Sequence, residues 1–106
     1  MKLEHYPVDK LQREIVAIVA RYLDLKQYKL FFFGSRVTGT AASGSDIDVG
    51  IDGPEAVPGH IMVEIRDALE NLRTLYTVDI VDFKQLSQEF RQIALETTEP
   101  ITVEEE

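Results

Sequence analysis

The sequence predicts an α/β (α+β) fold in which helices flank a small mixed β-sheet. Helical and strand-like patterns alternate along the chain, the strand-like runs are rich in aromatic and β-branched residues, and no repeat or linker divides the chain. The 106 residues are enough for one modest hydrophobic core and too few for two. We therefore expect a single domain over residues 1–106, with residues 101–106 fraying as an acidic tail.

Each element follows from its local pattern. The helices carry apolar side chains at helical spacing, and Pro7 with Asp9 suits the start of the first one. The strands are short apolar or alternating runs, and Gly34 and Asp52-Gly53-Pro54 close the first two. The aromatic residues of the first strand are expected in the core. In chain order, the predicted elements are a helix over residues 8–25, a strand over 28–33, a helical turn within 35–44, a strand over 46–51, a helix over 58–73, a strand over 77–83 and a helix from 86 to 96.

Composition excludes several classes of function. Eleven Lys and Arg residues against nineteen Asp and Glu residues leave a net charge of −8, which repels polyanions, so we expect no direct binding of nucleic acid. The chain has no cysteine, and His5 and His60 lie outside any ligand spacing, so a metal must be held by oxygen atoms. No signal-like segment opens the chain and no apolar run approaches the length of about 18 residues that spans a bilayer. We expect a cytoplasmic protein without a membrane partner.

The most informative motif is Gly34-Ser35 followed, after ten intervening residues, by Asp46-Ile47-Asp48. Side chains on a strand alternate between its two faces, so Asp46 and Asp48 project from one face while Ile47 projects into the core. Two carboxylates about 6–7 Å apart can bracket divalent metal ions. A Gly-Ser turn after a strand can offer backbone N–H groups, helped by a helix N-terminus, to an anion. The motif therefore predicts a site for a metal and a nucleoside triphosphate.

The third predicted strand supplies two further carboxylates, Asp79 and Asp82, on opposite faces. One of them could complete a two-metal site and help to activate an attacking hydroxyl. Periodicity does not choose between them. Asp79 sits in mid-strand, where a buried carboxylate without a partner is costly, so its presence favours a role in the site. Asp82 lies near the strand end and could simply be solvated, and the Asp-Gly-Pro context of Asp52 favours a turn.

Gly34-Ser35, the spacing to Asp46-Ile47-Asp48 and the strand 78–82 together resemble the DNA polymerase β nucleotidyltransferase superfamily. The fuller string from Gly34 through Gly39 to Asp48 is similar to the minimal nucleotidyltransferases that act as antitoxins in HEPN/MNT pairs, over nearly the whole chain. Residues 40–43 are small here, where family members often carry a charged residue. The resemblance implies a polymerase β-like fold. It also implies that Asp46, Asp48 and Asp79 are the catalytic and metal-binding residues, with two Mg²⁺ ions and ATP as substrate.

In this interpretation five residues bind the nucleotide: Gly34, Ser35, Arg36, Gly39 and Ser45. The first two hold the β and γ phosphates, because a residue without a side chain lets the backbone approach closely. Arg36 adds charge-assisted contacts to the phosphates, and a surface ion pair is its alternative role. Gly39 allows a tight turn or close approach of the nucleotide, or is purely conformational. Ser45 orients the following aspartate or contacts a phosphate, or is a turn residue.

The function implied by the resemblance is transfer of AMP from ATP to a hydroxyl of a HEPN toxin, most simply that of a tyrosine. The chain would act as an antitoxin and form a hetero-oligomer with the toxin. Its size supports a protein acceptor, since 106 residues leave no room for extra helices that hold a smaller acceptor. Two alternatives stay open: a non-catalytic antitoxin that masks its partner, and the catalytic subunit of a two-chain small-molecule nucleotidyltransferase. Three intact carboxylates favour the enzyme.

Overall fold

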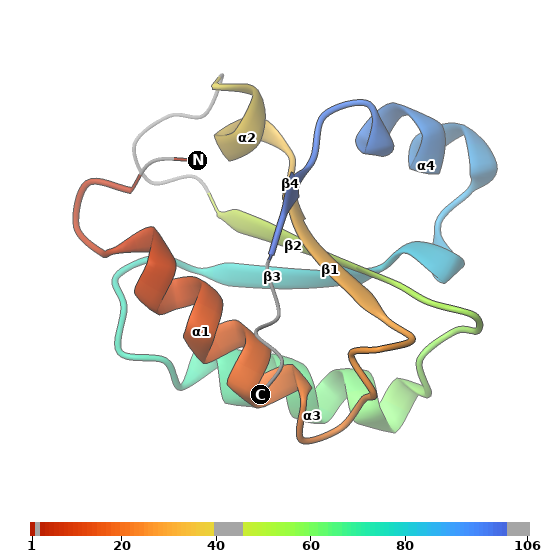
Figure 1. Ribbon diagram of the computed structural model, residues 1–106, viewed down its shortest axis with the longest axis horizontal. Helices are drawn as coiled ribbons and strands as arrows, with labels where there is room; N and C mark the ends of the chain where they lie inside the picture. Colours follow the sequence, from red (N-terminus) through yellow and green to blue (C-terminus); the bar gives the residue numbers. More distant parts are fainter. Residues whose placement is uncertain (2, 40–45, 102–106) are drawn as a thin grey trace.

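A four-stranded sheet with helices on both faces forms the body of the protein (Figure 1). The structure is a computed structural model, and it describes residues 1, 3–39 and 46–101. The strands lie in the order β3-β2-β1-β4, with β2 parallel to β3 and β1 antiparallel to both β2 and β4. The elements are α1 (Val8–Val19), β1 (Lys29–Phe33), α2 (Ser35–Thr38), β2 (Ile47–Asp52), α3 (Gly59–Glu70), β3 (Val78–Asp82), the 3₁₀ turn η1 (Phe83–Gln85), α4 (Gln88–Leu95) and β4 (Glu99–Pro100). The predicted mixed sheet is confirmed.

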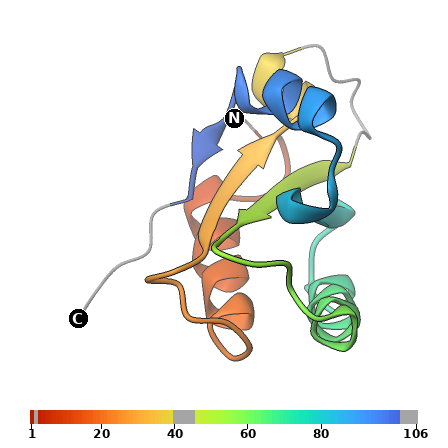
Figure 2. The same ribbon diagram turned by 90° about the vertical axis from the view of Figure 1, so that its right-hand side faces the viewer.

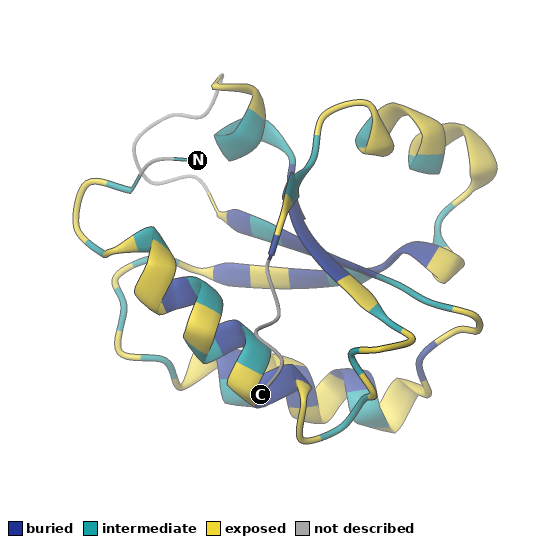
Figure 3. Cartoon of the chain, viewed as in Figure 1, coloured by how far each residue is buried: buried dark blue, intermediate teal, exposed yellow. Residues whose placement is uncertain are grey.

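The main core lies between the sheet and the helix pair α1 and α3 (Figure 3). Alternation places Ile47, Val49 and Ile51 of β2 in this core, fully buried, as the sequence predicts. From the helices, Leu11 and Ile65 pack against them. Within the described ranges, no helix combines the length and the apolarity needed to cross a membrane.

A second, smaller aromatic cluster covers the opposite face of the sheet. Phe31 and Phe33 of β1 meet Phe83 edge to face, with ring centroids 4.8 and 5.0 Å from the Phe83 ring. Gly50, the partner of Phe31 in the β1–β2 register, makes room for this cluster, because a Cβ there would overlap the Phe31 ring. Phe32 points the other way into the main core. The predicted core role of these aromatic residues is thus confirmed, and it is divided between two faces.

The helices α1 and α3 end earlier than the sequence predicts, and side-chain hydrogen bonds follow each end. The first helix was expected to reach residue 25 but stops at Val19, and Asp24 then builds a turn in which its carboxylate accepts from the Lys26 N–H at 2.9 Å. The third helix stops at Glu70, followed by Asn71, whose side chain donates to the Asp67 carbonyl at 2.9 Å. These side chains satisfy backbone groups that a longer helix would otherwise use.

The fourth strand is absent from the sequence prediction. Pro100 was expected only to follow the last helix, yet it pairs with Phe31 at the sheet edge, where a residue without an N–H is tolerated. Ile101 is 5% exposed and its N–H donates to the Leu30 carbonyl at 3.1 Å. The expected frayed tail is therefore wrong for Ile101, and residues 102–106 lie outside the described part of the chain.

Candidate active site

The parallel pairing of β2 and β3 brings two predicted aspartates together. Asp48 and Asp79 are direct partners in the register, and neighbouring strands lie about 4.8 Å apart. Both belong to the face opposite α1 and α3, since Ile47, Val49 and Ile80 occupy the alternate positions and are buried beneath those helices. Asp46 immediately precedes β2. The site thus lies at the end of the sheet where β2 and β3 begin.

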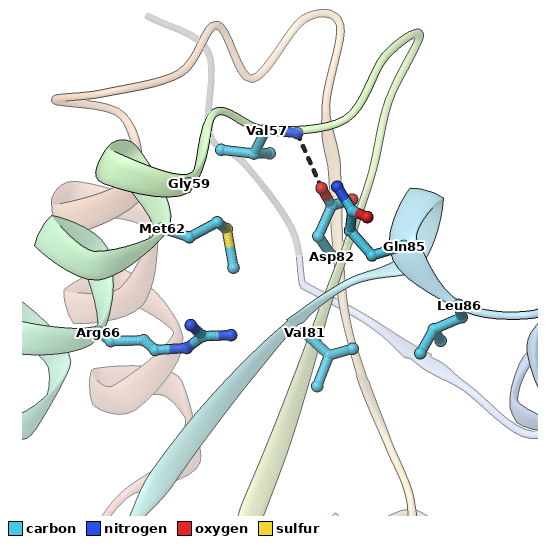
Figure 4. Close-up of a pocket in the computed structure, with 8 residues that line it drawn as sticks. All are labelled: Val57, Gly59, Met62, Arg66, Val81, Asp82, Gln85 and Leu86. Atoms are coloured by element: carbon cyan, nitrogen blue, oxygen red, sulfur yellow. Dashed lines mark hydrogen bonds between the residues drawn. The ribbon is translucent and has the colours of Figure 1, made fainter.

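Asp82 lies on the face that α1 and α3 cover, and its role there is structural (Figure 4). It is 4% exposed, and its two carboxylate oxygens accept from the Val57 N–H at 2.8 Å and the Lys84 N–H at 3.0 Å. The expectation that Asp82 is solvated is wrong, because the loop before α3 and the start of η1 both need its oxygens. The expectation of a buried mid-strand carboxylate at Asp79 is also wrong, since that residue is exposed.

The carboxylates affect one another electrostatically. Burial raises the pKa of Asp48 above its ordinary value, and the negative charges of Asp79 and Asp46 raise it further. The Asp48 carboxylate is thus half-buried beside two further negative charges at this end of the sheet. Such a set of oxygen donors fits Mg²⁺, which binds carboxylates and supplies the missing charge. Among the described residues, no three Asp, Glu or His side chains already converge on a common point as in a formed metal site.

Gly34 connects the phosphate-turn motif to the carboxylates. Its φ of 82° and ψ of −163° lie in a region that side-chain-bearing residues rarely occupy, and a Cβ on Gly34 would overlap the Asp48 Oδ2 atom. Phe33, the preceding residue, is the register partner of Asp48. The turn and the second aspartate are therefore in direct contact, which the sequence spacing alone does not reveal.

The other predicted nucleotide-binding residues are placed by the short helix α2. Ser35 begins this helix, and its carbonyl accepts from the Gly39 N–H at 3.0 Å. Gly39 ends the helix in the left-handed region with a φ of 84°, and no atom of the described residues lies within 4 Å of the position of an added Cβ. A conformational role is thus already visible for Gly39. Ser45 and residues 40–43 lie outside the described residues.

Arg36 contacts an aromatic residue that the sequence reasoning missed. Its guanidinium lies 4.8 Å from the centroid of the Tyr76 ring, a cation–π arrangement. The Tyr76 hydroxyl accepts from the backbone N–H groups of Glu4 at 3.0 Å and His5 at 3.2 Å, and the exposed His5 ring stacks on it with a centroid distance of 6.5 Å. Tyr76 precedes Asp79 by three residues, and that proximity in sequence is the available signal.

Asp52 has a different role from the predicted turn. It is the last residue of β2, and its carboxylate accepts from Arg91 Nη2 of α4 at 2.5 Å and lies 3.9 Å from the Lys84 ammonium. The residue therefore joins the sheet to α4. The Asp52 Oδ1 and Arg91 Nε atoms are inaccessible to water and have no hydrogen-bond partner within the described residues.

A cavity of about 300 Å³ lies on the other side of β3, away from the three aspartates (Figure 4). Its wall includes Met62 and Arg66 of α3 and Val81 and Leu86 near η1. Arg66 donates to the Ile80 carbonyl at 3.3 Å at the free edge of the sheet. Asp82 lines this cavity, but Asp46, Asp48 and Asp79 do not, so the cavity does not mark the candidate site.

Known proteins share both the sequence pattern and the fold. The family described as polymerase beta, nucleotidyltransferase, matches residues 13–106. The probable protein adenylyltransferase MntA of Haemophilus influenzae is 31% identical over 85 residues, a match that covers 78% of this chain and 75% of that protein. A chain in a crystal structure of a toxin–antitoxin with AMP-PNP superposes with a TM-score of 0.69 at 21% identity, covering 86% of this chain and 72% of that one.

A second solved structure, of the tri-AMPylated Shewanella oneidensis HEPN toxin in complex with MNT antitoxin, gives a TM-score of 0.64 at 18% identity. That match covers 90% of this chain and 72% of the other. The structural matches support the polymerase β-like fold, and the family match over residues 13–106 includes both aspartate-bearing strands. The chain therefore belongs to the polymerase β nucleotidyltransferase family and is a nucleotidyltransferase.

Proposed function

We propose that this chain is a Mg²⁺-dependent protein adenylyltransferase that transfers AMP from ATP to a tyrosine hydroxyl of a HEPN toxin and so acts as its antitoxin. The observation that carries the proposal is the register that sets Asp48 beside Asp79, with Gly34 against the Asp48 carboxylate. The similarity to a protein adenylyltransferase and to chains from toxin–antitoxin complexes supports the acceptor class. We propose that the reaction takes place in the cytoplasm, where ATP is abundant.

Asp46, Asp48 and Asp79 are the residues that would hold two Mg²⁺ ions. When bound, these ions neutralise charge on the triphosphate and on the attacking oxygen. The Asp79 carboxylate is exposed and can accept the proton of the incoming hydroxyl. The hydroxyl oxygen then forms a bond to the α-phosphorus, the bond to the bridging oxygen breaks, and pyrophosphate leaves with the electron pair.

In this proposal the Gly34–Ser35 turn binds the phosphates, and Ser45 contributes to the same task. Ser35 would hold the β and γ phosphates through its backbone N–H and hydroxyl, next to the carboxylates. Arg36 would neutralise phosphate charge from the same short helix, held in place by the Tyr76 ring. Gly39 ends that helix in the left-handed conformation, which a glycine adopts without steric cost, and in this proposal it allows close approach of the nucleotide.

Intact mass spectrometry tests the proposal directly. A HEPN toxin is incubated with the purified chain, Mg²⁺ and each of the four NTPs in turn. We expect a gain of one or more AMP units with ATP, lost in Asp48→Ala and retained in Asp67→Ala, an exposed aspartate on α3 that lies outside the proposed site. No mass gain with any nucleotide, while the HEPN protein stays accessible, would overturn the proposal.

Neutralisation by masking is the second candidate, and the exposed apolar side chains of α4 favour it, because they suit a lasting complex. The Asp48→Ala variant separates the two functions in a growth assay with the toxin. Loss of neutralisation with retained binding indicates catalysis. Full neutralisation by the variant indicates masking.

A further inference from the structure

The last helix, α4, presents its apolar side chains outward. None of its eight residues is buried, although Phe90 and Ile93 are large and apolar and remain 51% and 67% exposed. Its attachments to the sheet are Ala94, which packs against the Phe31–Phe33–Phe83 cluster, and Arg91, which pairs with Asp52. Isolated helices shorter than about 12–15 residues are marginal in water and normally depend on a buried apolar face. A bound partner that covers the exposed apolar side chains of α4 would stabilise this helix.

We infer that Glu89, Phe90, Ile93 and Glu96, named here the α4 flank, form the surface on which the acceptor protein docks. These residues are exposed and spaced so that they share one side of the helix. Two apolar side chains bordered by two carboxylates match a partner surface of apolar residues flanked by Lys or Arg. The inference rests on the proposed function in one respect, that the acceptor is a protein.

The position of α4 on the sheet supports the acceptor protein as the molecule that binds this surface. Figures 1 and 2 show α4 across the sheet from α1 and α3. Ala94 of α4 contacts the cluster that contains Phe33, and Phe33 is the register partner of Asp48. A protein bound to the α4 flank is thus held over the face that carries the carboxylates. Proximity of this kind raises the effective concentration of an acceptor hydroxyl.

Charge argues against a second copy of the chain on this surface. Each chain carries a net charge of −8, and the α4 flank adds two carboxylates at the contact itself. Elsewhere in the described part of the chain, the large exposed apolar residues Val63 and Leu75 stand singly on other segments. Scattered residues of that kind are normal on a protein surface, whereas an apolar pair bordered by one sign of charge indicates an interface.

Isothermal titration calorimetry with the HEPN toxin that is the acceptor in the mass-spectrometry test probes the docking surface. The double variant Phe90→Ser, Ile93→Ser is compared with Val63→Ser, a single residue of α3 with a similar exposed fraction of 53%. We expect the double variant to raise the Kd at least about tenfold and Val63→Ser to change it less than about twofold. The transfer reaction should show a raised KM for the HEPN protein with unchanged kcat, and the Mg·ATP-induced rise in Tm should stay the same.

Three results would overturn the inference: an unchanged Kd in the double variant, no complex with the wild-type chain, or a wild-type dimer that the double variant abolishes. Should the serine variant unfold, Glu89→Lys with Glu96→Lys decides, because reversed charges must slow association with a basic partner most strongly at low salt. A complex that forms at the α4 flank without AMP transfer would refute the proposed function and leave the docking surface standing.

Discussion

Gly34 is the position where a single methyl group should do the most damage to the site. In Gly34→Ala the backbone keeps a φ of 82° and ψ of −163°, a region that costs a residue with a side chain about 1–3 kcal/mol. The new Cβ also overlaps Asp48 Oδ2, so the carboxylate must leave its rotamer at a further cost of about 0.5–1.5 kcal/mol. We expect a total loss of about 2–4 kcal/mol from the free energy of unfolding.

The matched control is Gly39→Ala, which has a similar φ of 84° and whose added Cβ meets no atom of residues 1, 3–39 or 46–101 within 4 Å. This variant should lose only about 1 kcal/mol, the backbone cost alone. Urea denaturation followed by circular dichroism gives both free energies of unfolding. A third measurement isolates the contact: in an Asp48→Ala background, Gly34→Ala should cost about 1 kcal/mol less than in the wild-type chain. Equal losses for Gly34→Ala and Gly39→Ala would refute the reasoning.

Three further changes test other contacts. Asp48→Asn should stabilise the metal-free protein near pH 7, because a raised pKa means that ionisation of Asp48 opposes folding. The gain should shrink as the pH falls toward the ordinary carboxyl value of 3.8, and urea midpoints that drop at pH 7 would contradict it. Tyr76→Leu removes the ring that contacts Arg36 and should raise the KM for ATP about two- to fivefold, while Tyr76→Phe keeps the ring and should not. A pyrophosphate-release assay measures both KM values, and equal values would count against a positioning role for Tyr76. Arg91→Met removes the ion-pair partner of Asp52 and should lower the free energy of unfolding by about 1–3 kcal/mol. Hydrogen exchange of the α4 amides should become faster. Unchanged protection of α4 would show that this ion pair does not hold the helix on the sheet.

The sequence predicts the parts of the fold that depend on side-chain periodicity. Alternation places Ile47 and Val49 in the core and assigns the neighbouring aspartates to the other face, because each strand has one face under α1 and α3. The choice between Asp79 and Asp82 could not be made this way. Both strand faces meet other elements, and only the parallel register shows which aspartate lies beside Asp48. The structure places Asp79 there, and its catalytic role stays a prediction.

Features that depend on distant segments escaped prediction. β4 has two residues, one of them proline, and exists because the chain returns to the edge of β1. Asp82 is buried because Val57, far away in the sequence, needs an acceptor for its N–H. The contact between Arg36 and Tyr76 is likewise made across the fold. Local patterns carry no information about such partners, so helix ends and polar contacts were the least predictable parts.

The parallel β2–β3 ladder also sets when the site can exist during folding. β2 and β3 are joined only through the crossover helix α3, so Asp48 and Asp79 meet after a long loop has closed. Loop closure of this kind is slow, and here it also brings like charges together. A nascent or partly unfolded chain therefore holds the Gly34 turn and two aspartates without the third. Under the proposed function, activity would be a late event of folding, and a divalent cation held by the three carboxylates would favour the final docking of β3.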